Sequence, residues 1–315
     1  MQHYVKILFL LSSVSLSQIA IQTDWSGGAG VPGPVTDWGN YYDSSSGIDS
    51  AGGILQLSDT LLSNPVEHIV DGNYSSPTSV YPVDVDGDGD VDMVGSAIYA
   101  PEITWWENKD GSGITWIQHV VTNSFGSASA VYAADLNGDG YTDILGAGMS
   151  DSKIAWWENT DSIGTQWDEH IIDSSTDNAY SIIAADINND GYLDVLSYDH
   201  DTADKVSWWE NTDGSGTAWV RNTIDDDFWA ISVSAADING DGDMDALGAA
   251  PYSYINDVVW WENSDSIGTE WTKHLVVGGH IGVWSLYSAD IDDDGDLDIL
   301  GAAAIVNKII WWENT

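Results

Sequence analysis

Asp84-Val85-Asp86-Gly87-Asp88-Gly89-Asp90-Val91-Asp92 is an acidic stretch that recurs four more times in this chain of 315 residues. The lead aspartates of successive copies lie 51, 51, 51 and 53 residues apart. A fixed period near fifty residues is typical of a repeat architecture, in which one small structural unit is stacked on the next. The four later copies begin at Asp135, Asp186, Asp237 and Asp290.

Each repeat contains four short strand-like runs. The first leads into the acidic loop and begins near residues 79, 130, 181, 232 and 285 in the five copies. The second follows the loop, and the third carries a Trp-Trp-Glu-Asn sequence such as Trp105–Asn108. A turn of the Asp110–Gly113 kind leads into the fourth. Four strands in a unit of about 50 residues are typical of a propeller blade, so we predict an all-β propeller over residues 59–315.

The two ends of the repeat region differ in phase. Val66–Val70 matches a fourth strand with no earlier strands before it, and the sequence stops after a third strand at Thr315. The early strand could therefore complete the last blade, which predicts five blades closed by strand exchange and fewer free sheet edges. The alternative is that the sequence is a piece of a larger ring.

The composition is strongly acidic, with a formal net charge of -44, although 43% of the residues are hydrophobic and 18 are Trp. This apolar fraction is ample for a core. Negative charge of this size opposes binding to nucleic acid and to anionic membrane surfaces. There is no Cys, which excludes disulfides and thiol catalysis. We expect a monomer.

The N-terminal segment has the features of an export signal. Residues 1–17 combine a short start that carries one Lys, an apolar run over Ile7–Leu16 and small residues at Ser15 and Ser17. This pattern predicts a secretory signal peptide, too short to span a membrane, and a buried strand is the alternative. Residues 18–58 are rich in Gly, Ser, Pro and Asp, which predicts a linker or irregular cap. We therefore expect a secreted protein, extracellular or at the cell surface, without membrane insertion.

The acidic loops have the ligand pattern of a calcium site. Oxygen-bearing side chains stand at positions 1, 3, 5 and 9, Gly at position 6 permits a sharp bend, and position 7 offers its backbone carbonyl. The Glu at position 12 of an EF-hand is missing, so position 9 must carry more of the coordination. Crowded carboxylates repel one another unless cations bind, which favours Ca²⁺, up to one ion per loop, over turns held by side-chain hydrogen bonds alone. Mg²⁺ fits less well because it resists dehydration. The predicted ligands are Asp84, Asp86, Asp88, Asp90 and Asp92; Asp135, Asn137, Asp139, Tyr141 and Asp143; Asp186, Asn188, Asp190, Tyr192 and Asp194; Asp237, Asn239, Asp241, Asp243 and Asp245; and Asp290, Asp292, Asp294, Asp296 and Asp298.

These loops, with the Ala-Ala-Asp-Ile-Asn-Gly-Asp-Gly sequence that begins at Ala235, resemble the FG-GAP/VCBS repeat family, which includes relatives of the integrin alpha-subunit propeller. The resemblance covers about residues 64–315. It implies a propeller with Ca²⁺ in the turn between the first and second strands of each blade. The chain departs from the family in two ways: its Phe-Gly and Gly-Ala-Pro pieces are not regularly present, and such rings usually have seven blades.

The repeated aromatic residues are better suited to packing than to binding. Successive residues of a strand face opposite sides of the sheet, so each Trp pair covers both faces of its blade. An array that stacks on sugars is the alternative, but packing between blades accounts better for Trp at repeated positions. A His recurs at one fourth-strand position and is replaced by Asn222 in one copy, so we expect it to be structural. The four are His68, His119, His170 and His274.

A ligand must then be recognised by side chains that are not repeated. Such residues gather on the face opposite the acidic loops, where loop lengths also vary, and loops on a rigid scaffold commonly build binding sites. We predict a binding or adhesion module for a glycan or protein rather than an enzyme. The alternative is a hydrolase or lyase acting on glycans, with Asp199, His200 or Asp201 as acid or base. The predicted ligand-binding residues are Tyr180, Trp229, Trp284, Tyr198, His200, Tyr252 and Tyr254.

Overall fold

The computed structural model describes residues 67–176, 178–200, 204–251, 257–279 and 282–315. Within these ranges the chain forms nineteen strands, which build five antiparallel sheets in sequence order. No helix in the described ranges is long and apolar enough to cross a membrane. The predicted signal peptide and the predicted linker, residues 1–17 and 18–58, lie outside the described residues.

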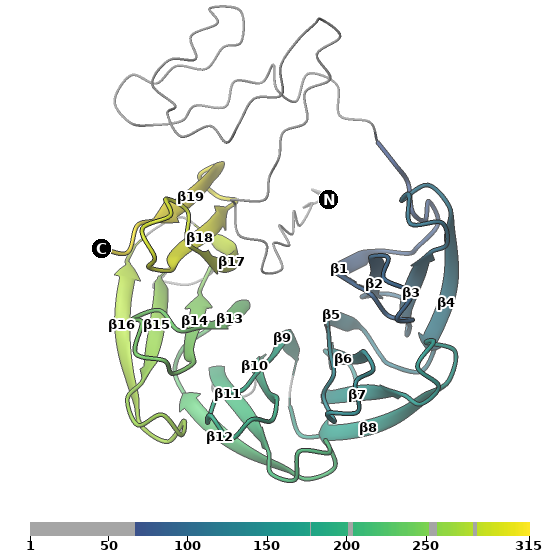
Figure 1. Ribbon diagram of the computed structural model, residues 1–315. Coiled ribbons are helices and arrows are strands. Elements are labelled where there is room, and N and C mark those ends of the chain that lie inside the picture. The colour runs from purple at the N-terminus through teal and green to yellow at the C-terminus, as the bar shows by residue number, and fades with distance from the viewer. Residues whose placement is uncertain (1–66, 177, 201–203, 252–256, 280–281) are drawn as a thin grey trace, which may run out of the picture. The chain divides into compact units, whose positions relative to one another are not determined.

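Each sheet is one blade (Figure 1). Blade 1 contains β1 (Pro77–Val83), β2 (Asp92–Ala97), β3 (Ile103–Asn108) and β4 (Trp116–Thr122). Blade 2 contains β5 (Ala128–Ala134), β6 (Asp143–Gly148), β7 (Lys153–Asn159) and β8 (Trp167–Asp173). Blade 3 contains β9 (Ala179–Ala185), β10 (Asp194–His200), β11 (Asp204–Asn211) and β12 (Trp219–Asp225). Blade 4 contains β13 (Ser232–Ala236), β14 (Asp245–Ala249), β15 (Val258–Asn263) and β16 (Trp271–Val277), and blade 5 contains β17 (Val283–Ala289), β18 (Asp298–Ala303) and β19 (Lys308–Trp312).

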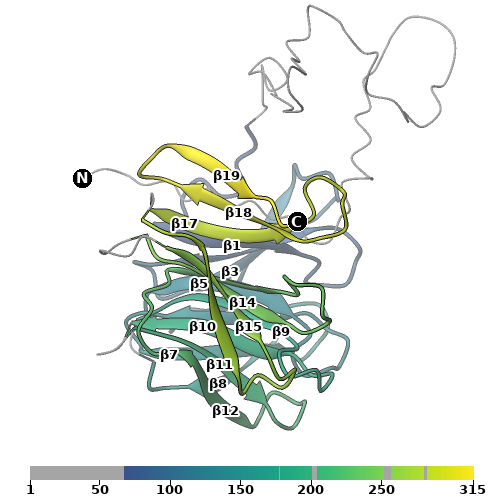
Figure 2. The same ribbon diagram turned by 90° about the vertical axis from the view of Figure 1, so that its left-hand side faces the viewer.

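The first strand of every blade lies nearest the central axis, and the later strands follow outward (Figure 1). First strands of neighbouring blades pack on one another, β1 on β5, β5 on β9, β9 on β13 and β13 on β17. Their small residues, such as Ala133 and Ala184, are nearly buried and permit this close approach. Figure 2 shows the sheets of successive blades lying face to face. The prediction of an all-β propeller of five blades is confirmed.

The Trp pairs join the blades, as predicted. The first Trp donates its indole N–H to a backbone carbonyl in the next blade, and Trp105, Trp156 and Trp208 reach Gly164, Gly216 and Gly268 at 3.0–3.2 Å. The second Trp donates to a carboxylate at the end of the preceding blade, as Trp209 does to Asp173 and Trp261 to Asp225, both at 2.9 Å. The pair in blade 3, Trp208 and Trp209, therefore connects that blade to both of its neighbours, and the rings of the pairs form the centre of the core between blades.

The predicted strand exchange is not found. Residues 67–70 belong to no strand, Val66 lies outside the described residues, and the sheet of blade 5 has three strands with β19 at its edge. Asp71 instead accepts the indole N–H of Trp106 in blade 1 at 3.4 Å, in the way that Asp173 accepts that of Trp209. In the described part of the chain the strands of blades 1 and 5 do not pack on each other as neighbouring blades do. Asp71 is therefore bonded to blade 1, and no described strand pairs with the free edge of β19.

Candidate functional sites

The acidic loops are closed by the aspartate at position 9, which is nearly inaccessible to solvent in all five copies. One oxygen of each of these carboxylates accepts the backbone N–H of loop position 2 at 2.9–3.1 Å. The other accepts the N–H of the Asn that follows the Trp-Trp-Glu sequence, at 2.8–2.9 Å. Position 9 therefore fixes the loop to the third strand of its own blade. The five residues are Asp92, Asp143, Asp194, Asp245 and Asp298.

In blades 2 to 5, the Asn that follows the Trp-Trp-Glu sequence also ties the loop to the preceding blade. The side-chain amide of Asn159 donates to the carbonyl of Val85 in blade 1, and that of Asn211 donates to Leu136 in blade 2. Asn263 and Asn314 make the same bond to the loops of blades 3 and 4. Loop position and blade packing are thus set by the same side chains.

Inside each loop, the lead aspartate folds the backbone around itself. Asp84 accepts the N–H groups of Gly87 and Gly89 at 2.8 and 2.9 Å. Gly89 has φ of 93°, a conformation that favours Gly, and the four equivalent glycines have φ between 89° and 100°. The loop sequence therefore bends the chain so that the side chains at positions 1, 3 and 5 converge.

Two loops bring three carboxylates together. Asp84, Asp86 and Asp88 have oxygens within 4.8 Å of one another, and Asp290, Asp292 and Asp294 form the same cluster in blade 5. In the three middle loops position 3 is Asn, and Asn137 donates its amide to Asp139 at 3.1 Å. Carboxylate and amide oxygens are hard ligands of the kind that Ca²⁺ prefers, so the donor set fits this ion.

The surroundings of Asp86, Asp92 and Asp143 disfavour the charged forms of these carboxylates in the absence of a cation. Burial, aided by the charges of Asp88 and Asp84, raises the pKa of Asp86. At position 9, burial raises the pKa of Asp92 to about 6 and that of Asp143 to about 7, despite two backbone hydrogen bonds to each carboxylate. A divalent cation would offset this repulsion, because its charge stabilises the ionised form of every ligand.

Position 7 contacts the turn between the third and fourth strands. The carboxylate of Asp243 accepts the hydroxyl of Ser266 at 2.6 Å, and the ring of Tyr192 lies against Gly214. The acidic loops and these turns therefore share one face of the propeller. The opposite face carries the connections between blades and the loops between second and third strands.

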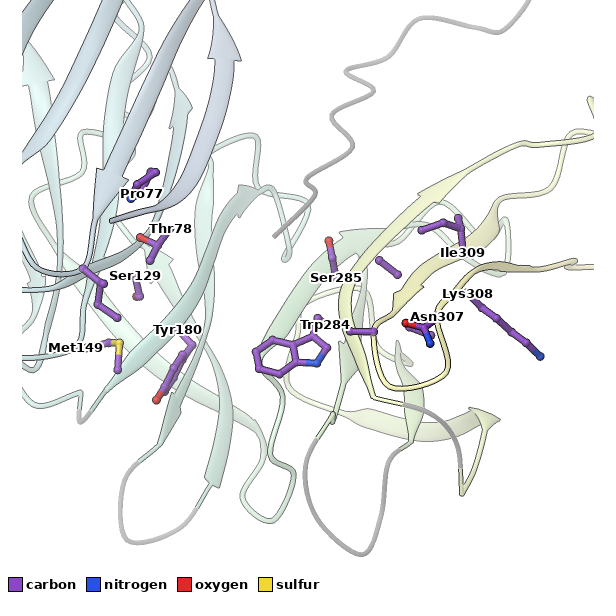
Figure 3. A pocket seen from close by; sticks show the side chains of 14 residues that line it. Pro77, Thr78, Ser129, Met149, Tyr180, Trp284, Ser285, Asn307, Lys308 and Ile309 are labelled. Carbon is purple, nitrogen blue, oxygen red and sulfur yellow. The ribbon is translucent and has the colours of Figure 1, made fainter. Parts of the chain in front are cut away.

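A large hollow lies on that opposite face, at the end of the central axis (Figure 3). Its volume is about 520 Å³, and its lining comes from blades 1, 2, 3 and 5. Trp284 extends from the blade 5 side toward Tyr180, and Met149 and Ser129 lie beyond Tyr180. Two of the predicted ligand-binding residues, Tyr180 and Trp284, are thus brought together at one hollow.

Three other predicted residues form a neighbouring cluster. The Nδ1 atom of His200 lies 2.5 Å from an oxygen of Asp204, and the Tyr198 hydroxyl donates to the same carboxylate at 2.9 Å. The His200 ring stacks on Trp229, with 5.3 Å between centroids and 4° between planes. Tyr198 is fully buried, so it supports this cluster from behind and is not placed to contact a ligand. Its ring lies 6.2 Å from that of Tyr180, which links the cluster to the hollow.

Two predicted ligand-binding residues are not described by the structure, and three residues that line the hollow were not predicted. Tyr252 and Tyr254 lie outside the described residues. Pro77, Ile98 and Met149 line the hollow but were not predicted, because nothing in their type distinguishes them from ordinary loop residues. Their positions, at the start of a first strand or after a second strand, were the only available signal.

The residues named for the enzymatic alternative are engaged in other contacts. Asp199 is nearly buried and lies 2.5 Å from the guanidinium of Arg221. Asp201 lies outside the described residues. The repeated histidines occupy structural positions, since His119 stacks on Trp105 and its Nε2 lies 2.9 Å from Glu107, and His170 and His274 repeat the arrangement.

Comparison with known proteins agrees with this architecture. Residues 84–146, 135–197 and 191–248 each match the FG-GAP-like repeat, and together they cover more than half of the chain. Each match starts in or near one acidic loop and ends beyond the next. No curated protein matches the chain.

Proposed function

The chain belongs to the FG-GAP-like repeat family, and from this premise we propose that it is a secreted, calcium-stabilised propeller that binds an extracellular glycan or protein. Calcium is held on one face and the ligand on the other. The observation that carries the ligand part is the axial hollow, which is lined by two aromatic side chains that are not part of the repeat, Tyr180 and Trp284.

The acidic loops support the calcium part. Positions 1, 3 and 5, with the carbonyl of position 7 and the carboxylate of position 9, would hold the ion, as in the loop from Asp84 to Asp92. Bound Ca²⁺ would neutralise the crowded carboxylates and hold the loop in one conformation. The loops with three clustered carboxylates, in blades 1 and 5, have the highest ligand charge and are proposed to bind most tightly.

The separation of the two faces supports a binding role. Repeated side chains are committed to blade packing, as the Trp pairs are, or to the acidic loops. The hollow is lined by side chains that differ from blade to blade, and in the described lining it contains no carboxylate. In a chain with a net charge of -44, this is a region where a ligand would meet little local negative charge.

We also propose that the protein is not an enzyme. Asp199 is paired with Arg221, and the carboxylate beside His200 already accepts a hydroxyl from Tyr198. These contacts suit a stable polar cluster on the ligand face. Loss of Trp229 or His200 should therefore alter ligand binding rather than any turnover.

The calcium part is tested by elemental analysis of protein purified in Ca²⁺ and then dialysed. We expect several ions per chain, at most five, and the loss of about one ion in Asp88→Ala and in Asp294→Ala. A matched control is Asp110→Ala, which removes an exposed carboxylate from a turn on the same face. Protein without bound Ca²⁺, or equal ion content in all three variants, would contradict the proposal.

The ligand part is tested by screening immobilised glycans and a displayed peptide library against the Ca²⁺-loaded protein. Binding of any selected ligand should weaken in Trp284→Ala with little change in melting temperature, because this ring lies at the hollow. Trp311→Ala is the control, since Trp311 is a partly exposed Trp outside the hollow. If both variants bind every ligand as the parent protein does, the ligand face is misplaced.

A further inference from the structure

The hollow at the axis continues into a second hollow between the first strands. The second has a volume of about 240 Å³ and shares Tyr180, Trp284 and Ser285 with the first. The two together form one path along the axis, entered from the face opposite the acidic loops. We call the outer part the mouth and the inner part the channel.

The mouth is mainly apolar. Pro77, Ile98, Met149 and Trp284 contribute to its wall, and the Thr78 and Ser129 hydroxyls there already donate to backbone carbonyls. Lys308 borders the mouth, but its side chain points away from Trp284 and Tyr180 (Figure 3). A ligand must therefore present an apolar surface to the mouth, opposite the Trp284 ring.

The channel has a different chemistry, because its wall carries a set of hydroxyl groups. Tyr81 and Tyr132 lie with ring centroids 4.5 Å apart, and Tyr287 and several serines complete the wall. Burial raises the pKa of Tyr81 and of Tyr287, so these phenols stay neutral. In the described part of the chain, four serine hydroxyls of the channel have no hydrogen-bond partner: Ser79, Ser234, Ser285 and Ser288.

These walls exclude several classes of ligand. Among the described residues that line the channel none is charged, so neither a carboxylate nor an ammonium group would find a counter-ion there. A hydrocarbon chain would suit the mouth, but in the channel it would bury hydroxyls without partners, which costs free energy for each. The path requires a neutral ligand with one apolar face and several hydroxyls of its own.

A pyranose ring of a neutral glycan has this combination, since its C–H groups form an apolar face and its hydroxyls surround the ring. We infer that the axial path binds the terminal residues of a neutral glycan, stacked on Trp284 at the mouth and hydrogen-bonded to serine and tyrosine hydroxyls in the channel. This inference rests on the proposed binding function and names its ligand class. The mouth lies on the face opposite the acidic loops and the channel lies behind it, so the sugar that stacks on Trp284 and the sugar that reaches the channel hydroxyls are neighbours at one end of the glycan.

The test is calorimetric titration of the Ca²⁺-loaded protein with neutral tetrasaccharides of glucose, xylose and mannose, beside a tetramer of galacturonic acid. At least one neutral tetrasaccharide should bind and the acidic tetramer should not. Ser234→Ala and Ser288→Ala each remove one hydroxyl that makes no hydrogen bond within the described part of the chain, so they should fold normally and weaken binding about threefold to tenfold. Trp284→Ala should weaken it about tenfold or more, and Trp311→Ala should not.

The outcomes separate this inference from the proposed function. If no neutral tetrasaccharide binds at millimolar concentration, or if both serine variants bind as the parent does, the inference is overturned. A peptide or apolar ligand that is lost in Trp284→Ala would overturn the glycan assignment and leave the binding function standing. Saccharide binding that survives Trp284→Ala unchanged would overturn both, because the site would lie elsewhere.

Discussion

Gly216→Ala and Gly113→Ala are a matched pair of substitutions that measures how the blades are joined. Both glycines stand at the same turn of their blades, between the third and fourth strands, with φ of 68° and 70°. A Cβ atom on Gly216 would lie 2.6 Å from the Trp156 ring of the preceding blade. On Gly113 it would meet only Trp116 of its own blade, at 4.0 Å. The two positions therefore share the backbone penalty and differ in the contact between blades.

The magnitude follows from these distances. Alanine in a left-handed conformation costs roughly 1–2 kcal/mol, partly offset by about 0.4–1 kcal/mol from a less disordered unfolded chain, so Gly113→Ala should cost roughly 1 kcal/mol. Gly216→Ala adds overpacking of about 1–3 kcal/mol, because the Trp156 ring must move and its 3.0 Å hydrogen bond to the Gly216 carbonyl is strained. The difference of about 1–3 kcal/mol corresponds to a melting temperature lower by about 2–12 °C in a domain of this size.

The assay is urea and thermal unfolding in saturating Ca²⁺, followed by Trp fluorescence and circular dichroism. Gly268→Ala, whose Cβ would lie 2.6 Å from the Trp208 ring, should behave like Gly216→Ala. Equal free energies of unfolding for Gly113→Ala and Gly216→Ala would refute the argument that the Trp-to-Gly contact joins neighbouring blades.

Three other expectations follow from the same contacts. Chelation of Ca²⁺ should lower the melting temperature markedly, since an ion that binds only the folded state stabilises it by mass action, and a melt unchanged in excess chelator would contradict this. Trp106→Ala should destabilise the fold by about 3–5 kcal/mol and leave ligand affinity nearly unchanged, which binding and unfolding measurements on one sample can separate. Although burial acts to raise the pKa of Asp225, its bonds to Lys273 and to the indole of Trp261 hold this pKa below its usual range. A depressed pKa stabilises the fold above the unfolded value and the effect is lost in acid, so the parent should lose more stability than Asp225→Asn below about pH 4 in unfolding titrations.

The sequence alone was sufficient for the blade and for the form of the acidic loops, and the ligand set of each loop stays a prediction. The period of the acidic loops set the number of blades, and alternation along the strands placed the Trp pairs on both faces of each sheet. The acidic loops are local structures, in which the Asp84 carboxylate accepts the backbone N–H groups of Gly87 and Gly89 within five residues. Residues close in the sequence therefore determine the conformation of the loop. The same locality explains why the loop from Asp290 could be predicted as readily as the first.

Only the tertiary structure showed which residues from different blades lie close together. The hollow is lined by Trp284 of blade 5, Tyr180 of blade 3 and Met149 of blade 2. The spacing of these residues in the sequence does not predict that they line one hollow. The sequence predicted that Tyr198 contacts a ligand, yet pairing of β10 with both of its neighbours buries this side chain completely. The expected strand exchange failed for the same reason. Strand exchange would need blade 5 to lie beside blade 1. Whether the two blades come together depends on side-chain packing at every interface between blades. The order of residues within one repeat does not determine that packing.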